Sequence, residues 1–553
     1  MAASKKEKEN VKEIPLTEFQ SEFRDYIFSA HSCIAIETVE NTRLIGDIQR
    51  LSKFIGMEVF RWSASMGLSC ISENTSPEEL DPDDILKHLY NFGKETKIRE
   101  DIIETKENKN KTLEKCKVFI LENFCIYLEQ DPIIRSWLCS CINLFRECGM
   151  IIVLVGPIIR LHPEIESGVT LIDYPLPTEE ETRETLVGIQ EAASAVPHLD
   201  TKISKEDELA IIRNCLGLSN LAISDALSHS LIKYKSLKPE TVLEAKIQQI
   251  RKTGILEYYA TDKYKLDNMG GLDILKSWIL KRKDAFTPAA RIYGVAEPKG
   301  VMLAGVPGCG KSHSAKTIAN LLNVPLLRLD IGACLGSLVG ESEEKFRRAL
   351  KTASAMAPNV LWLDEIEKGF AGATSNLDSG VKAGIFGEFI HFMQERKAPV
   401  FVVATANNIE GLPPELLRKG RFDELFFIDL PAFEERKEIF KIHLKLTKRN
   451  LIKFDLDKLS ENAKGFSGSE IEECIKSALY DSFCDNQREL TTEDVICQIK
   501  QTIPLVKTMP EQIQQIRTWG DTRARNASSQ SSDSRDLQAN LGMGLGKRKL
   551  REN

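Results

Sequence analysis

The strongest constraint on how this chain folds is an apolar run that leads straight into a glycine-rich turn and then into a helical pattern. The run begins at Gly300, the helical pattern begins at Ser314, and the turn between them fits G-x-x-x-x-G-K-[ST]. Such a turn wraps backbone N–H groups around phosphate groups at a helix N-terminus. In this pattern the lysine reaches the β- and γ-phosphates and the serine gives an oxygen to Mg²⁺, so the sequence predicts a nucleotide site. Its predicted residues are Gly305, Val306, Pro307, Gly308, Cys309, Gly310, Lys311 and Ser312.

Two carboxylates, Asp364 and Glu365, end a second apolar run, and Asp364 comes 53 residues after Lys311. We expect Asp364 to hold the Mg²⁺ shell and Glu365 to polarise the attacking water. A strand that ends in Asp-Glu is often only a solvated strand end, and the nearby turn is what favours the catalytic interpretation. Asn407, at the end of the run 400–405, is predicted to orient the same water; the alternative is an ordinary turn asparagine.

Two arginines, Arg418 and Arg421, lie three residues apart in a segment that we expect to be a loop. Solvated surface arginines are the default interpretation of such a pair. Beside a phosphate-binding turn, the pair is better interpreted as a reader of the γ-phosphate of a neighbouring subunit, because a guanidinium offers a fixed planar donor fork. This interpretation predicts a catalytic site that two subunits share.

Short apolar, β-branched runs alternate with helical patterns along the chain, which predicts parallel sheets covered by helices. Five runs precede the turn and its strand, at 32–38, 57–62, 117–122, 150–155 and 169–173. Five more fall at 301–304, 326–330, 360–364, 400–405 and 425–429, and a helical segment follows each set, at about 179–234 and 434–503. The charged stretch from Thr75 to Lys111 is expected to be a loop or a peripheral insertion.

The two halves share sequence as well as order. The segment from Asn214 aligns without gaps on the segment from Asn462, with Asn, Gly, Ser, Ile and Leu coinciding. The alternative to a true repeat is that two unrelated helical segments share a similar glycine cap and apolar stripe. We interpret the chain as two similar α/β units. The expected parts are a charged extension (1–19), a first α/β unit with helices (20–236), a linker (237–264), an α/β core (265–432), a helical lid (433–518) and a flexible tail (519–553).

Five stretches of the second half form a set with the turn and the Asp-Glu pair. They are Asp267-Asn-Met-Gly-Gly-Leu, Pro298-Lys-Gly-Val-Met-Leu-Ala-Gly, Gly340-Glu-Ser-Glu, Arg418-Lys-Gly-Arg-Phe-Asp and Gly465-Phe-Ser-Gly. Over about 265–480 the chain resembles the AAA clade of the AAA+ ATPases. The resemblance implies a P-loop NTPase core with Walker A and Walker B motifs and a helical lid, with ATP and Mg²⁺ as ligands. It further implies Asn407 as the sensor-1 residue, Gly468 near the nucleotide, Arg418 and Arg421 as arginine fingers acting in trans, and a homo-oligomeric ring, a hexamer.

Further features of the second half are Asp378-Ser-Gly, Phe386-Gly, Met393-Gln-Glu and Phe401-Val-Val-Ala-Thr-Ala-Asn. They resemble the AAA proteins named after hypothetical chloroplast open reading frame forty-six, and the resemblance extends into the first half but supplies no substrate. Many protein-threading AAA+ members carry an aromatic residue in the central pore loop, where this chain has Leu338. This departure weakens the expectation of unfoldase activity.

The first half lacks all three phosphate-handling elements. After its first predicted strand the chain reads Glu37-Thr-Val-Glu-Asn-Thr-Arg, without glycine or Lys-Ser/Thr. The run that corresponds to 360–365 ends in Glu122 and Asn123, with an amide in place of the second carboxylate. The segment that would carry the paired arginines has 8 residues where the second half has 13. We predict a degenerate AAA-like module that does not hydrolyse ATP and serves as a scaffold or a partner surface.

The sequence favours an ATP-driven ring that binds and hydrolyses Mg-ATP to remodel or regulate a protein partner. A slow nucleotide-dependent switch or assembly module is the alternative, favoured by Leu338 and by the missing first site. A nucleic-acid motor is the weakest interpretation, because 81 Asp and Glu against 74 Lys and Arg give a net charge of −7. No apolar run approaches the length of a membrane span, so we expect no membrane contact and a cytoplasmic protein, or a plastid stromal one if the source is an alga.

Overall fold

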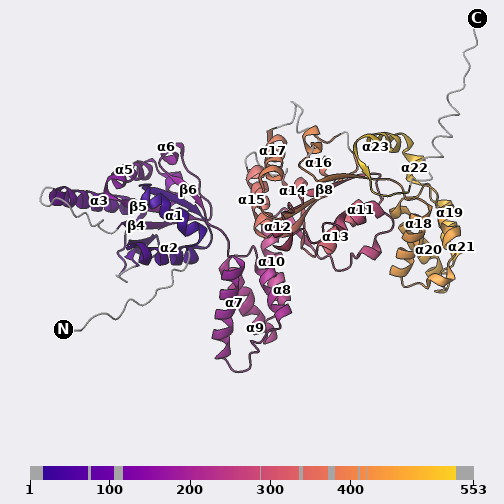
Figure 1. Cartoon of the computed structure of the whole chain (residues 1–553), viewed down its shortest axis with the longest axis horizontal. Coiled ribbons are helices and arrows are strands. Elements are labelled where there is room, and N and C mark those ends of the chain that lie inside the picture. The colour runs from indigo at the N-terminus through magenta and orange to yellow at the C-terminus, as the bar shows by residue number, and fades with distance from the viewer. Residues whose placement is uncertain are drawn as a thin grey trace, which may run out of the picture. The chain divides into compact units, whose positions relative to one another are not determined.

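The computed structural model of the chain describes residues 16–71, 76–104, 116–286, 288–334, 341–370, 380–408, 411–418 and 420–530. The chain divides into two compact units. The first comprises Met1–Lys202 and Leu218–Leu237, and the second comprises Ile203–Gly217 and Lys238–Asn553. Each unit contains one sheet with helices on both faces (Figure 1). Within the described residues, no helix combines the length and the hydropathy needed to cross a bilayer.

The sheet of the first unit has the strand order β3-β2-β4-β5-β1-β6. The strands are β1 (Cys33–Glu37), β2 (Glu58–Ser63), β3 (Gly67–Cys70), β4 (Lys117–Glu122), β5 (Met150–Gly156) and β6 (Thr170–Asp173). Neighbouring strands are parallel except for the antiparallel pair β2 and β3 at one edge. Every residue of β5 is buried, as expected for a continuous apolar run in a sheet that is covered on both faces. All five predicted strands are present, and β3 is an addition.

Helices α1 and α2 cover one face of this sheet, and α3 and α5 cover the other. The helices of this unit are α1 (Glu18–Phe28), α2 (Asn41–Ile55), α3 (Pro82–Glu104), α4 (Cys125–Gln130), α5 (Pro132–Cys148), α6 (Pro163–Glu166), α7 (Glu179–Ser194) and α9 (Asn220–Tyr234). We expected a loop or a peripheral insertion over 75–111, and the loop alternative is wrong over 82–104, which form α3. Ile85, Leu86 and Leu89 are buried, so this charged stretch has an apolar face that the average composition concealed.

The sheet of the second unit has the strand order β13-β12-β8-β11-β10-β9-β7. The strands are β7 (Leu256–Tyr259), β8 (Gly300–Gly305), β9 (Leu326–Leu329), β10 (Asn359–Leu363), β11 (Val400–Ala406), β12 (Glu424–Ile428) and β13 (Arg525–Asn526). All neighbours are parallel except β7 and β9. The order β9-β10-β11-β8-β12 matches β2-β4-β5-β1-β6 of the first unit strand for strand. The recurrence in the sequence is therefore a recurrence of fold, and the predicted α/β class is confirmed.

The helices of the second unit form two groups in sequence. The first group is α8 (Lys205–Cys215), α10 (Pro239–Lys252), α11 (Asp273–Leu280), α12 (Pro288–Tyr293), α13 (Lys311–Leu322), α14 (Ile331–Cys334), α15 (Glu341–Ala355), α16 (Ile366–Phe370) and α17 (Gly380–Glu395). The second group is α18 (Phe433–Leu446), α19 (Leu456–Asn462), α20 (Gly468–Cys484), α21 (Thr492–Gln501), α22 (Leu505–Thr508) and α23 (Pro510–Arg523). Helices α18 to α21 share an apolar core of their own, around Phe440, Leu459 and Ile475, and we call them the lid.

The stretch 237–264, for which we expected a linker, contains α10 and β7. Strand β7 pairs with β9 at the sheet edge, and Ile250 and Leu256 are buried in the core of the second unit. Helix α8, expected in the first unit, groups with the second unit as well. A strand of only four residues at a sheet edge carries too little periodicity to be recognised in the sequence.

Residues 520–526, part of the stretch 519–553 for which we expected a flexible tail, complete α23 and form β13, which runs parallel to β12. The part of that stretch beyond residue 530 lies outside the described residues. Helix α23 approaches the sheet closely at Gly520, where a Cβ would overlap the ring of Phe427. Arg517 is only 3% exposed and places its Nε 2.9 Å from the carboxylate of Asp429. This docking depends on contacts with β12, almost a hundred residues earlier in the chain, which local sequence patterns do not report.

Candidate nucleotide site

The glycine-rich turn lies at the carboxyl end of β8 and leads into α13, as predicted. Gly305 has a φ of 148°, and a Cβ there would overlap the backbone carbonyl of Ile428 on β12. The next residue, Val306, donates its N–H to the same carbonyl at 2.9 Å. Only glycine allows the turn to pass so close to the neighbouring strand.

Lys311 is the first residue of α13, and its side chain bends back into the turn. Its Nζ donates to the carbonyl oxygens of Gly305 at 2.9 Å and Val306 at 2.7 Å. Burial lowers the pKa of this amine to about 8, although Glu367 and Asp364 are among the groups that oppose the shift. A buried cation at a helix N-terminus favours an anion beside it, which is what a phosphate group supplies.

Ser312 and Asp364 lie together at the end of the sheet. The Ser312 hydroxyl donates to Oδ1 of Asp364 at 2.9 Å, and the hydroxyl of Thr405 on β11 donates to the same oxygen at 2.6 Å. Hydroxyl and carboxylate oxygens are the donors that Mg²⁺ prefers, so this pair fits the predicted cation.

Glu365, separated from the end of β10 by Asp364, adopts a left-handed backbone conformation with φ at 49°. Its Oε1 accepts a hydrogen bond from Nδ2 of Asn407 at 2.8 Å, and its Oε2 pairs with the amine of Lys368. Its backbone N–H donates to the hydroxyl of Thr405 at 3.0 Å. The predicted base and the predicted sensor residue are therefore in direct contact.

The two arginines differ in their surroundings. Arg418 is exposed, whereas Arg421 is 7% exposed and donates to the backbone carbonyl of Glu415. Burial, with the nearby Arg418, lowers the pKa of Arg421. Among the described residues, neither guanidinium forms a hydrogen bond or ion pair with the P-loop of its own chain.

The lid touches the turn at the start of α20. Gly468 is the first residue of this helix, and Ser469 donates its N–H to the carbonyl of Gly308 at 3.0 Å. Gly308 has a φ of 77°, and a Cβ there would lie 2.8 Å from the hydroxyl of Ser467. Small residues on both sides thus let the lid rest on the phosphate-binding turn.

Thr405 and Glu367 take part in this arrangement, and sequence reasoning did not single them out. Glu367 is 6% exposed and accepts the backbone N–H of Asn407 at 3.0 Å. Side chains alternate between the two faces of a strand, so Thr405 lies on the same side as Asn407. This alternation could have identified Thr405 from the sequence. Leu338, in the predicted pore loop, lies outside the described residues.

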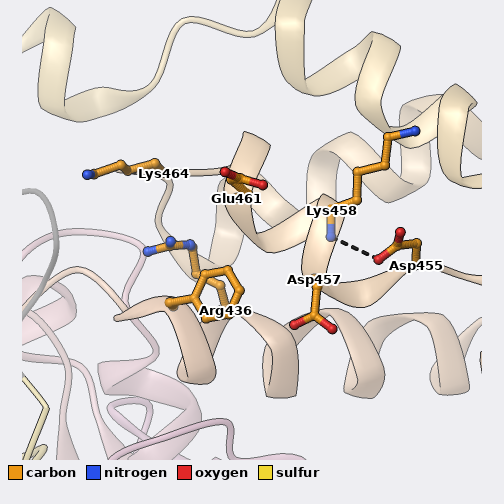
Figure 2. Close-up of a pocket in the computed structure, with 7 residues that line it drawn as sticks. Arg436, Asp455, Asp457, Lys458, Glu461 and Lys464 are labelled. Atoms are coloured by element: carbon orange, nitrogen blue, oxygen red, sulfur yellow. Dashed lines mark hydrogen bonds between the residues drawn. The ribbon is translucent and has the colours of Figure 1, made fainter.

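The lid also contains an open hollow of about 740 Å³ (Figure 2). It is lined by Phe433, Arg436, Asp455, Asp457, Lys458, Glu461 and Lys464. Its lining residues carry equal numbers of positive and negative charges. Two of them form ion pairs with residues outside the lining: Asp457 with Lys437 at 2.6 Å and Lys458 with Glu493 at 3.1 Å. None of the predicted site residues lines it, and we assign it no ligand.

A glycine-rich turn at the end of a central parallel strand, with acidic residues at the end of β10, defines the P-loop nucleoside triphosphatases. Residues 301–430 match the ATPase family associated with various cellular activities (AAA), and residues 19–174 match the SpoVK-like AAA ATPase, N-terminal domain. The class is therefore that of the AAA ATPases.

The chain is 40% identical over 420 residues to a Pyropia yezoensis protein described as the uncharacterized AAA domain-containing protein ycf46, covering 75% of this chain and 84% of that protein. The ycf46 protein of Guillardia theta is 39% identical over 412 residues, which are 74% of this chain and 80% of that protein. The chain belongs to the ycf46 family of AAA ATPases and is an ATP hydrolase. A proteasome-activating nucleotidase of Saccharolobus islandicus is 32% identical over 224 residues, 39% of this chain and 55% of that protein.

Proposed function

We propose that the second unit binds ATP with Mg²⁺ and hydrolyses it within an oligomeric ring, and that turnover remodels or regulates a protein partner. The observation that carries this proposal is a continuous series of hydrogen bonds beside the P-loop. It runs from Ser312 to Asp364, through Thr405 to Glu365, and from Glu365 to Asn407. The series joins the residues predicted to hold the cation and the water, and this connection supports their acting together beside the P-loop.

In this mechanism Lys311 and the backbone N–H groups of the turn hold the phosphates. Glu365 accepts a proton from the water that attacks the γ-phosphate, and Asn407 keeps its carboxylate oriented. Ser312 and Asp364 would hold Mg²⁺, which neutralises charge that develops on the phosphoryl oxygens. Glu365 is 37% exposed, so water has access to it.

The proposed ring rests on Arg418. This side chain is exposed in a loop between β11 and β12, and it makes no bond to the P-loop of its own chain within the described residues. A guanidinium in that position can serve the nucleotide of an adjacent subunit, and repeating this head-to-tail contact closes a ring. We therefore propose that each active site is completed by the next subunit.

The ring is tested by the mass of the chain in solution. The Glu365→Gln chain in Mg-ATP is expected to sediment as an assembly about six times the monomer mass, because trapped ATP holds subunits together. The Lys311→Ala chain, which cannot hold phosphate, is the matched control and should remain smaller. A chain that binds ATP and still sediments as a monomer would contradict the ring.

Thr405 provides a test of the connected site. Thr405→Val removes the hydroxyl but keeps the shape, and we expect turnover to fall about tenfold and the Mg²⁺ requirement to rise, because Asp364 loses a positioning partner. Thr405→Ser keeps the hydroxyl and should remain close to the unaltered chain. The measurement is ATP turnover as a function of Mg²⁺ concentration; equal losses in both variants would show that only packing matters at this position.

We propose that the first unit is the degenerate scaffold that its sequence suggests. Asn123 follows β4 with a φ of 55°, the conformation that Glu365 has after β10, but it carries an amide. The preceding carboxylate, Glu122, is engaged by Arg61 and by Nδ2 of Asn41 at 3.0 Å. The backbone of a catalytic turn is thus retained without a group that activates water.

A slow switch without substrate threading is the second candidate, and Leu338 is the feature that favours it. The involvement of a protein partner, the lack of a nucleic-acid partner and a cytoplasmic location, or a stromal one in an alga, stay predictions.

A further inference from the structure

A buried carboxylate, Glu40, lies in the first unit where the second unit has its P-loop. Strands β1 and β8 take the same place in their sheets, and each leads into the next helix of its unit, α2 or α13. The residue that caps α2 is Glu40, and the residue that caps α13 is Gly310. Glu40 therefore stands at the point of the chain that completes the phosphate-binding turn in the second unit.

The Glu40 carboxylate joins this loop to the helices that follow the sheet. Its side chain is 3% exposed, and its Oε2 lies 2.7 Å from a guanidinium nitrogen of Arg43. Its Oε1 accepts the backbone N–H of Asn220, the first residue of α9. In the aligned segments Asn220 corresponds to Gly468, the first residue of α20 in the lid.

Arg43 extends the same network to α7. It donates to both carboxylate oxygens of Glu181, at 3.0 and 2.9 Å, and to the backbone carbonyl of Pro175 at 2.7 Å. Its guanidinium lies 4.8 Å from the ring centre of Tyr174. Burial opposes the charge, but Tyr174, Glu181 and Glu40 together raise the pKa of Arg43. Glu40 and Arg43 both have partners, so neither charge is left buried alone.

We propose that the Glu40 carboxylate fills the phosphate position of the first unit and holds helices α7 and α9 closed on its sheet without nucleotide. A helix N-terminus beside an arginine selects an anion, and here the chain supplies that anion itself. In the second unit the lid contacts the turn one residue further along the helix, where Ser469 donates to the neutral carbonyl of Gly308, and the turn stays available for phosphate. The first unit is closed permanently, whereas the second retains a place for its ligand.

The critical test removes one hydrogen bond from α9. Asn220→Pro deletes the N–H that Glu40 accepts, at a helix position where proline is otherwise favoured. Asn220→Ala keeps that N–H and loses only the side-chain contact with Thr185. In the full chain we expect amide hydrogen exchange over 221–231 to be roughly ten- to a hundredfold faster in Asn220→Pro than in Asn220→Ala. Equal exchange in the two variants would overturn the proposal.

A second variant examines the carboxylate itself. Glu40→Gln removes the charge with little change of shape, and Glu37→Gln makes the same change at an exposed residue of β1. We expect faster exchange in α7 and α9 for Glu40→Gln alone. If the two variants behave alike, the charge of Glu40 does not hold the unit closed.

Nucleotide stoichiometry separates this proposal from the one made for the second unit. The Glu365→Gln chain, titrated with a fluorescent ATP analogue, should bind at most one nucleotide per chain, and Lys311→Ala should abolish that binding. A second nucleotide per chain would contradict a filled first site. If nucleotide binding is lost when the first unit is changed but persists in Lys311→Ala, the assignment of the P-loop is wrong.

Discussion

The Glu365→Gln chain is expected to bind ATP about as tightly as the unaltered chain and to turn it over about 10²–10³-fold more slowly. Glutamine retains the oxygen that accepts the hydrogen bond from Asn407, so the site keeps its shape. It does not accept a proton from water at neutral pH, so the chemical step loses its base. Lys311, Ser312 and the turn are unchanged, which is why binding should persist.

Single-turnover hydrolysis and equilibrium binding, measured on the same preparation, separate these two effects. Glu395→Gln makes the same change at an exposed position at the end of α17 and should leave both quantities unaltered. If Glu365→Gln hydrolyses ATP at the normal rate, another group activates the water and the role given to Glu365 is wrong.

Arg418→Ala is expected to lose about 10³-fold in turnover, comparable to the loss of an arginine finger supplied by a neighbour. The loss should be reversible by mixing, because the Arg418→Ala subunit still has an intact P-loop. A Lys311→Ala subunit has the opposite defect, since it presents Arg418 but holds no phosphate. In a one-to-one mixture, about a quarter of the interfaces combine a sound P-loop with a sound arginine.

The measurement is ATP turnover of the mixture relative to each variant alone. The double variant Lys311→Ala with Arg418→Ala is the matched control, because mixing it with Lys311→Ala restores no complete site. A mixture that forms joint assemblies without regaining turnover would show that Arg418 acts within its own subunit or not at all.

The parts of the site that short motifs encode could be predicted from the sequence. Ser312 and Asp364 belong to segments that follow β8 and β10, the two strands on either side of β11, so their meeting follows once the class of fold is known. The five predicted strands of each unit are present for a related reason: buried parallel strands are continuous apolar runs. Asn407 and Glu365 likewise meet at the carboxyl ends of neighbouring strands.

What the sequence did not reveal depends on contacts between distant segments. Helix α3 has the buried side chains of Ile85, Leu86 and Leu89 within a charged stretch, β7 has four residues at a sheet edge, and α23 with β13 depends on β12. Glu40 is the clearest case, since a lone glutamate in a turn carries no signal until Asn220, 180 residues later, is found beside it. Local periodicity reports which face is buried, not which partner covers it.

The position of β13 has a consequence for synthesis on the ribosome. Strand β12 ends at Ile428, but its outer neighbour is formed by Arg525 and Asn526. The first unit can fold while the remainder of the chain is still being made, since domains fold in order as they emerge. The second sheet is completed only after Asn526 has been translated, almost a hundred residues after β12. A chain released early would therefore carry a finished first unit and an unfinished ATPase, and the edge of β12 would be open to other strands.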